Sequence, residues 1–303
     1  MTKVPENLIL DALNTPQIPA AVVCADQGSL LESVKEASKI NLIKPILIGD
    51  KKNIHSIAND INFNIENLEI IDEQSDVECA AIGCELAKEN KIKIMVKGHL
   101  HTDVLMRAYL KKEFGLIGGK RLSHIWHMSS DLLKKPLFIT DGALNVAPRV
   151  DIKLHILRNA IEFANKTGLA KPKIAILSGT EDPIESMPSS VEAEEVMRLA
   201  KKENVNAYVY GPLALDNAVS KEAAKIKNIQ NDVAGDADIL LVPNLETGNS
   251  LSKIMVYFMQ ACAAGIIVGG KVPVCLLYTS DAADEGLGVD LRRRPIIKKK
   301  NGG

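Results

Sequence analysis

Aromatic residues, paired cysteines and long uncharged runs are all scarce in this chain of 303 residues. Aromatics make up 4% of it, so we do not expect the stacking platforms on which single-stranded nucleic acids bind. The five cysteines are scattered and odd in number, without the spacing of a zinc site or a disulfide framework, which favours a reducing, cytoplasmic compartment. No uncharged stretch reaches the roughly 18 to 20 apolar residues of a transmembrane helix, and the first 14 residues lack the apolar core of a secretory signal.

The chain also lacks an excess of charge of either sign. The chain has 37 Lys and Arg residues against 38 Asp and Glu residues, so no net field attracts nucleic acid or a membrane surface. We therefore expect neither nucleic acid nor a membrane as a partner.

Apolar, β-branched runs alternate with helical patterns, which predicts an α/β fold with a mainly parallel sheet. Residues 76–89 and 151–165 carry apolar side chains at three- and four-residue spacing and are expected to be helices. The carboxyl ends of parallel strands are where such sheets bind ligands. Strands are predicted at residues 20–24, 45–48, 68–71, 92–96, 136–140, 173–177, 207–210, 239–242 and 266–268.

A glycine-rich break at residues 115–119 suggests a change of domain near Lys120. We expect a first α/β domain at residues 1–120 and a second at 121–268. Residues 269–303 should return one strand to the first domain and then enter an aberrant tail at 275–303. From Cys275 the alternating pattern stops, and CLLYTSDAADE resembles the translation of a transposase-type sequencing adapter. We expect this tail to be an artefact joined to a truncated gene, so its basic run carries no functional inference.

Several familiar catalytic motifs are excluded. A P-loop would need glycine where Phe114 stands and Ser or Thr where Arg121 follows Gly-Gly-Lys. No G-x-S-x-G turn is present, so an α/β-hydrolase lacks its nucleophile. The single cysteines are interpreted as small buried hydrophobes.

A metal site is not expected. His99 and His101 would share one face of an extended segment, and the pair His124 and His127 would be neighbours on a helix. Metal binding would need a third ligand from elsewhere, and nothing in the sequence marks one.

Four stretches contain residue types that packing of a core does not require. In the first, a strand delivers Gly98-His99-Leu100-His101, and Thr102 could cap a helix that bears Arg107, so that backbone amides and a guanidinium face one anion. The second is residues 211–218. In the third, residues 237–249, Gly248-Asn249 would open a helix with Lys253 behind it. The fourth, residues 269–274, is a turn that feeds one last strand.

Read in order, the segments HTDVLMRAYL, RLSHI, ITDGALNVAP, GPLALDNAVS, ADILLVPNLETGNSLSK and GGKVPV resemble the phosphate acetyl/butyryltransferase family, in particular its butyryl branch. The resemblance covers residues 1–274, and the compact length also suits that branch. It implies a two-domain subunit of the isocitrate/isopropylmalate-dehydrogenase-like fold with a cleft between domains, assembled as a homodimer or higher homo-oligomer. It also implies reversible transfer of an acyl group between CoA and phosphate.

The resemblance implies which residues bind CoA and phosphate, and it assigns CoA as a substrate, with no bound cofactor and no metal. The CoA thiolate would attack the acyl phosphate directly in a ternary complex, without a covalent acyl-enzyme. For Asp216 a turn carboxylate is as good an interpretation as a site role. The implied binding residues are Arg107, His101, Thr102, Gly248, Asn249, Lys253 and Asp216.

One departure from the family pattern stands out. The family continues after its last strand with a Ser-Arg pair and an acidic residue that act on the carbonyl and the thiol proton. Here Val274 is followed by CLLYTSD, so no catalytic residue is assigned, and we predict that the chain as written is nearly inactive. Two alternatives stay open: a non-catalytic acyl-CoA-binding or regulatory relative, and a dehydrogenase of the related fold. The latter needs a carboxylate cluster for a metal and a nicotinamide site, and the sequence shows neither.

Overall fold

The structure, a computed structural model, describes residues 4–276, so residues 277–303 of the predicted tail lie outside it. Its described strands form one 11-stranded sheet in the order β3-β2-β1-β4-β11-β10-β5-β6-β9-β7-β8. Seven of the ten pairings between neighbouring strands of this sheet are parallel, which confirms the predicted α/β fold with a mainly parallel sheet.

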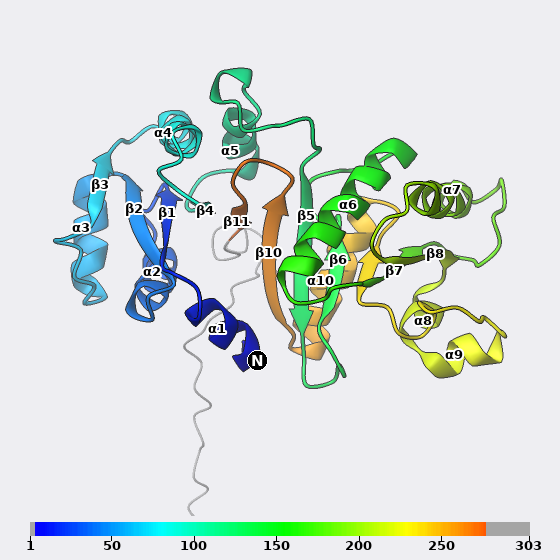
Figure 1. The fold of residues 1–303 in the computed structure, drawn as a ribbon. Helices are drawn as coiled ribbons and strands as arrows, with labels where there is room; N and C mark the ends of the chain where they lie inside the picture. Colours follow the sequence, from blue (N-terminus) through cyan, green and yellow to red (C-terminus); the bar gives the residue numbers. More distant parts are fainter. Residues whose placement is uncertain (1–3, 277–303) are drawn as a thin grey trace, which may run out of the picture.

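The first half of the sheet has helices on both faces (Figure 1). Apolar side chains of α2 and α3 pack on one face, and those of α4 and α5 pack on the other. Its elements are α1 (Glu6–Leu13), β1 (Ile18–Val23), α2 (Gly28–Lys39), β2 (Ile43–Gly49), α3 (Lys51–Asp60), β3 (Glu69–Asp72), α4 (Asp76–Lys88), β4 (Ile94–Lys97), α5 (Thr102–Tyr109) and the 3-10 turn η1 (Lys112–Phe114).

The second half is built in the same three layers. Helices α6 and α7 cover one face of its strands, while α8 and α10 pack on the opposite face. Its elements are β5 (Ser123–Ser129), β6 (Leu137–Thr140), α6 (Val150–Lys166), β7 (Lys173–Leu177), α7 (Pro188–Lys202), β8 (Tyr208–Leu213), α8 (Leu215–Val219), α9 (Lys221–Ile226), β9 (Ile239–Leu241), α10 (Leu245–Met259) and β10 (Cys262–Val268).

The halves meet at β11 (Val274–Leu276), which pairs parallel with β4 and antiparallel with β10. Because β10 is also antiparallel to β5, and β5 to β6, the parallel strands of the two halves run in opposite directions. Two glycines bring this junction close to its neighbours. A Cβ on Gly269 would collide with the carbonyl oxygen of Arg121, and one on Gly270 with the hydroxyl of Tyr109 in α5.

All nine strands predicted from the sequence correspond to observed strands, with ends shifted by a few residues. The exception to the sequence interpretation is β5, because the segment that contains His124 and His127 was expected to be helical. It is a strand whose seven residues are all buried, covered by α6 on one face and α10 on the other. A strand buried on both faces does not alternate apolar and polar residues. The serines and histidines of β5 also interrupt the continuous apolar run by which such a strand is recognised.

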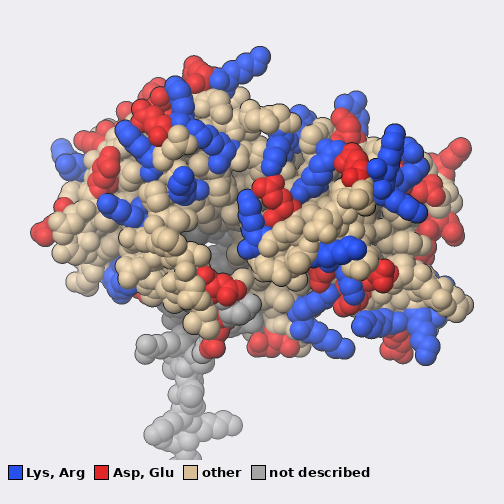
Figure 2. Space-filling view, in the orientation of Figure 1, with Lys and Arg blue, Asp and Glu red and all other residues tan. Residues whose placement is uncertain are grey.

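Three cysteines, Cys24, Cys79 and Cys84, are buried in the first half. A hydrogen bond with Cys79 and burial raise the pKa of Cys24, and burial raises the pKa of Cys84 to about 12. These two thiols are therefore protonated and unreactive near neutral pH. No helix within residues 4–276 is both long and apolar enough to cross a bilayer. On the face shown in Figure 2, positive and negative side chains are interspersed.

Candidate functional site

The segment between β4 and α5 is held tightly against the end of β1. The amide of Gly98 donates to the Val23 carbonyl at 2.8 Å, and that of His99 donates to the Cys24 carbonyl at 2.9 Å. A Cβ on Gly98 would overlap both of those carbonyl oxygens, so the glycine is required by this close approach. The predicted glycine turn after the strand is thus present, and its geometry is set by β1.

Helix α5 differs from the sequence prediction at its start. His101, not Thr102, is the N-cap residue, with no side-chain hydrogen bond from it, and Thr102 is the first helical residue. Arg107 lies in the last turn of this helix, and its side chain is 80% exposed. Its guanidinium forms an ion pair with Asp103, one turn earlier, at 2.8 Å. The backbone of Arg107 is five residues past Thr102, or about 7.5 Å along the helix axis, and the ion pair shows that its side chain reaches back to the first turn.

A lysine that the sequence interpretation passed over lies at the root of this segment. Lys97 ends β4, is 1% exposed, and lies in register between Val23 of β1 and Leu276 of β11. Lysine is almost never fully buried without a partner, because removing its charge from water is costly. A lysine that closes an apolar strand just before Gly98 is the sequence signal that could have found it.

The third predicted segment contains a helix N-terminus, but the helix begins earlier than expected. Helix α10 starts at Leu245, and Asn244 caps it by accepting from the Thr247 amide at 2.9 Å and the Thr247 hydroxyl at 2.6 Å. The Leu245 amide donates to the Val146 carbonyl at 2.9 Å. Two of the first three amides of α10 are therefore already used by the protein itself.

Gly248 and Asn249 lie one turn inside α10. Gly248 is buried where the helix crosses the end of β6, and a Cβ there would stand 2.8 Å from the Gly142 Cα and 2.9 Å from the Asp141 carbonyl oxygen. The glycine therefore permits close helix packing. Lys253, one turn further on, is half-buried.

Asp141 organises the loop that Gly248 packs against. It is 2% exposed, and its carboxylate accepts hydrogen bonds from the amides of His124, Ala143 and Leu144 at 2.9–3.0 Å. The Asn145 side-chain amide adds a fourth at 2.7 Å. With four donors, the buried charge is fully hydrogen-bonded and the loop after β6 is fixed.

His124 stands directly beside this carboxylate. Its ring is fully buried, contacts the Trp126 ring edge-on with centroids 4.9 Å apart, and has no hydrogen-bond partner for either ring nitrogen among the described residues. Burial lowers its pKa to about 4, with Asp141 acting in the opposite direction. The imidazole is therefore neutral at physiological pH.

Asp216 lies in a different part of the molecule. It is exposed in the first turn of α8, after β8, which forms one end of the sheet. β8 is seven strand positions away from β4, or about 34 Å at roughly 4.8 Å per strand. The structure therefore does not bring Asp216 next to Arg107.

The polar centre of the Asp216 loop is Glu181, which the sequence interpretation missed. Its carboxylate accepts from the Ala214 amide at 3.1 Å and the Asn217 side chain at 2.6 Å, and it pairs with Lys227 at 2.9 Å. Burial acts to raise the pKa of Glu181, but these three donors outweigh it and the net shift is downward. Glu181 and Asn217 shape the loop, whereas Asp216 faces solvent.

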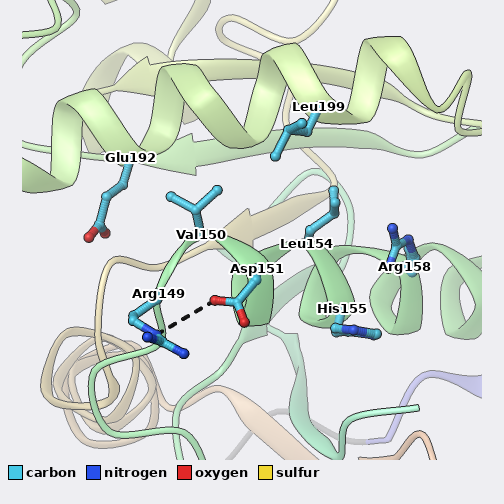
Figure 3. A pocket seen from close by; sticks show the side chains of 8 residues that line it. All are labelled: Arg149, Val150, Asp151, Leu154, His155, Arg158, Glu192 and Leu199. Atoms are coloured by element: carbon cyan, nitrogen blue, oxygen red, sulfur yellow. Dashed lines mark ion pairs between the residues drawn. The ribbon is translucent and has the colours of Figure 1, made fainter. Parts of the chain in front are cut away.

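Two cavities flank the start of α6. One of about 680 Å³ runs between α6 and α7, and Figure 3 shows Arg149, Asp151, His155, Arg158 and Glu192 around it. Arg149 lies 3.7 Å from Asp151, and Arg158 pairs with Glu203. A second cavity of about 320 Å³ is lined by Arg121, Asn145 and Arg149, among others. Arg149 lines both cavities. Neither cavity is lined by Arg107, by Asp216 or by a residue of α10. Within residues 4–276, no group of three His, Cys, Asp or Glu side chains is placed to hold a metal ion.

Comparison with known proteins agrees with this architecture. A branched-chain phosphotransacylase from Enterococcus faecalis superposes with a TM-score of 0.75 at 33% identity, covering 86% of this chain and 91% of that one. A 4-hydroxythreonine-4-phosphate dehydrogenase from Burkholderia phymatum, 13% identical, shares the fold at a TM-score of 0.56, over 90% of this chain and 94% of its own. This confirms the predicted dehydrogenase-like fold.

Proteins similar in sequence are phosphate acyltransferases. A phosphate acetyltransferase from Rickettsia prowazekii is 40% identical over 281 residues, which are 92% of this chain and 80% of the relative. A phosphate butyryltransferase from Clostridium beijerinckii is 34% identical over 283 residues, 93% of this chain and 94% of the relative. Residues 76–289 match the family described as phosphate acetyl/butaryl transferase. This chain therefore belongs to the phosphate acetyl/butaryl transferase family.

Proposed function

We propose that the function of this protein is the reversible transfer of an acyl group between CoA and inorganic phosphate, and that the chain as written, without the Ser-Arg pair, retains little of it. The observation that carries the proposal is the family match over residues 76–289. The CoA thiolate attacks the carbonyl carbon of the acyl phosphate and forms a carbon–sulfur bond. The bond between that carbon and the oxygen that bridges to phosphorus breaks, and phosphate leaves with the electron pair. The tetrahedral oxyanion formed on the way needs fixed hydrogen-bond donors, each worth about 3 to 4 kcal/mol when removed. We place the reaction in the cytoplasm.

For the acyl group, the proposal is butyryl in preference to acetyl. Relatives named for butyryl and branched-chain acyl groups support it at 34% and 33% identity, and the acetyltransferase at 40% identity supplies the competing outcome. Two buried methylenes are worth about 1.6 kcal/mol, or roughly a 15-fold difference in kcat/KM. Competition between butyryl-CoA and acetyl-CoA measures this ratio, and a preference for acetyl-CoA would refute the choice.

Arg107, with His101 and Thr102, is proposed to bind an anionic group of CoA or phosphate. The guanidinium is 80% exposed, and its partner Asp103 holds it by a surface ion pair, an interaction worth about 0 to 1 kcal/mol. An incoming phosphate can therefore replace Asp103 at little cost. Gly248, Asn249 and Lys253 of α10 are proposed as the second set of contacts, and Asp216 is included on the family resemblance alone.

Binding of CoA to the full 303-residue chain tests this assignment by calorimetry. We expect Arg107→Ala to weaken binding of CoA or phosphate at least tenfold, because it removes a charge-assisted contact. Arg198→Ala is a matched control, since Arg198 is also an exposed arginine that pairs with an acid on its own helix, Glu195, at 2.6 Å. Equal affinity for the wild type and the Arg107 variant would remove Arg107 from the site.

A second candidate is a non-catalytic acyl-CoA-binding relative, favoured by the absence of Ser-Arg after Val274. Both candidates predict that the chain as written binds CoA and releases almost no CoA from butyryl-CoA and phosphate. Near-normal turnover would contradict the predicted inactivity. Resequencing the 3′ end of the gene separates the candidates, because recovery of Ser-Arg and an acid supports the enzyme and confirmation of the present ending supports the binding protein.

A further inference from the structure

Cys24 has an unusual backbone conformation at the end of β1. Its φ is +54°, in the left-handed region, and the other six non-glycine residues with positive φ between residues 4 and 276 are five asparagines and one glutamine. Asparagine tolerates this region because its side chain can hydrogen-bond locally, whereas the cysteine side chain brings no such compensation. Since strained positions of this kind cluster at functional sites, the conformation points to a role for Cys24 beyond packing.

Neighbouring strands hold Cys24 in this conformation. Its carbonyl accepts from the His99 amide at 2.9 Å, and the next amide, that of Ala25, donates to the Ile48 carbonyl at 2.9 Å. Cys24 therefore links the ends of β4 and β2 to the end of β1, and it lies beside the candidate segment that begins at Gly98.

The side chain of Cys24 contacts a second cysteine. Cys24 and Cys79 form a side-chain hydrogen bond, and both lie in one apolar core, 4% and 1% exposed. The Cys24 thiol also donates to Oδ1 of Asp76 at 3.7 Å. The Cys79 thiol donates to the Glu73 carbonyl at 3.4 Å. Because Asp76 and Cys79 share the first turn of α4, the Cys24 sulfur lies against that turn, beside the Cys79 sulfur.

We propose that Cys24 and Cys79 form a redox pair, which hydrogen peroxide converts to a disulfide and a dithiol reductant restores. The Cys79 thiolate attacks one oxygen of the peroxide, a sulfur–oxygen bond forms, the oxygen–oxygen bond breaks, and the hydroxide released takes up a proton. The Cys24 sulfur then attacks the sulfenic sulfur of Cys79, and the hydroxyl leaves as water with the Cys24 thiol proton. Two thiols lose two electrons, and one peroxide is reduced to two waters.

The two sulfurs have different surroundings and therefore different roles. The hydrogen bond from Cys24 lowers the pKa of Cys79, against the opposing effects of burial and of nearby carboxylates, so Cys79 is the thiol that ionises and attacks. Cys24 stays protonated while it donates to that charge, and it attacks after Cys79 has become a neutral sulfenic acid. Both side chains are buried, so the oxidant must be as small as peroxide, and oxidised glutathione is excluded. The disulfide would join the first turn of α4 to the strand end that holds the segment before α5.

Peptide mapping of the full chain after peroxide treatment in native buffer tests the proposal. After quenching and alkylation in denaturant, we expect linked peptides that contain Cys24 and Cys79, loss of two of the five thiols, and recovery of all five with dithiothreitol. Cys24→Ala should stop at a Cys79 sulfenic acid that dimedone traps. Cys84→Ala is the matched control and should form the same link, since Cys84 is buried in the same core and burial, not a second thiol, raises its pKa.

A native chain that keeps Cys24 and Cys79 as thiols under peroxide, or that links other cysteines as readily, would overturn the proposal. A link between them that forms equally in urea would overturn it as well, because the fold would then play no part. The wild-type map decides the matter even where the alanine variant at Cys24 misfolds. The inference does not rest on the proposed function, and because its readout is a covalent link, it can fail while CoA binding succeeds.

Discussion

Replacing His124 with phenylalanine should remove a large part of the acid sensitivity of this protein. The ring is fully buried with no hydrogen-bond partner for its nitrogens among the described residues, and burial lowers its pKa from 6.5 to about 4. Between these two values the unfolded chain binds a proton that the native state does not. Stability therefore falls as the pH drops from about 6.5 to about 4.

The size of the effect follows from the two pKa values. A shift of one unit corresponds to about 1.4 kcal/mol, so the whole interval is worth about 3 kcal/mol, and about 2 kcal/mol of it lies between pH 7 and pH 5. The side chain is fully buried, so solvent does not screen it. Phenylalanine keeps the edge-on contact with Trp126 and does not titrate.

Urea unfolding of the wild type and of His124→Phe at pH 7 and pH 5 measures the difference. The quantity to compare is the free energy of unfolding of the variant minus that of the wild type. From pH 7 to pH 5 this difference should rise by about 2 kcal/mol, whatever its value at pH 7. Groups common to both proteins, including the buried His127, cancel in this comparison. His124→Leu repeats the test if phenylalanine fits poorly against Gly265. A gap independent of pH would refute the assignment of a depressed pKa to His124.

Two further substitutions test the packing that positions the candidate site. Gly248→Ala should lower the free energy of unfolding by about 1 to 3 kcal/mol, because its Cβ would meet the Gly142 backbone at 2.8 Å. In the same urea titration, Gly118→Ala is the control: its Cβ would lie in open space, so its free energy of unfolding should stay within about 0.5 kcal/mol of the wild type. Tyr109→Phe removes the bond from the buried hydroxyl to the Val272 carbonyl at 2.5 Å and leaves that carbonyl without this donor, so it should cost about 1 to 2 kcal/mol in thermal or urea unfolding.

The sequence predicted the fold better than the site, for physical reasons. Strands such as β1 and β7 are continuous apolar runs, and their burial depends on hydrophobicity alone. β5 was missed because it is buried on both faces while it carries two serines and two histidines. Its polar atoms are accommodated by tertiary partners, such as the Asn159 side chain that donates to the Ser123 hydroxyl at 2.9 Å, and no local pattern reports a partner 36 residues away.

Within the candidate segments, the structure differs from the sequence interpretation in the roles of several residues. Gly98 and Gly248 looked like parts of anion sites, and the structure shows that both allow backbone segments to approach closely. For Asp216 a turn carboxylate and a site role were equally good interpretations, and the carboxylate that holds this loop together is that of Glu181, 33 residues before Ala214. Lys97 was overlooked because a single lysine at a strand end resembles a solvated residue until its burial is known.

Helix α10 carries Asn249 and Lys253, two of the proposed contacts with CoA or phosphate, and the protein itself already holds this helix in place. Its inner side is fixed by Gly248 against Gly142 and by Met255 in the core. Its start is held by the Asn244 cap.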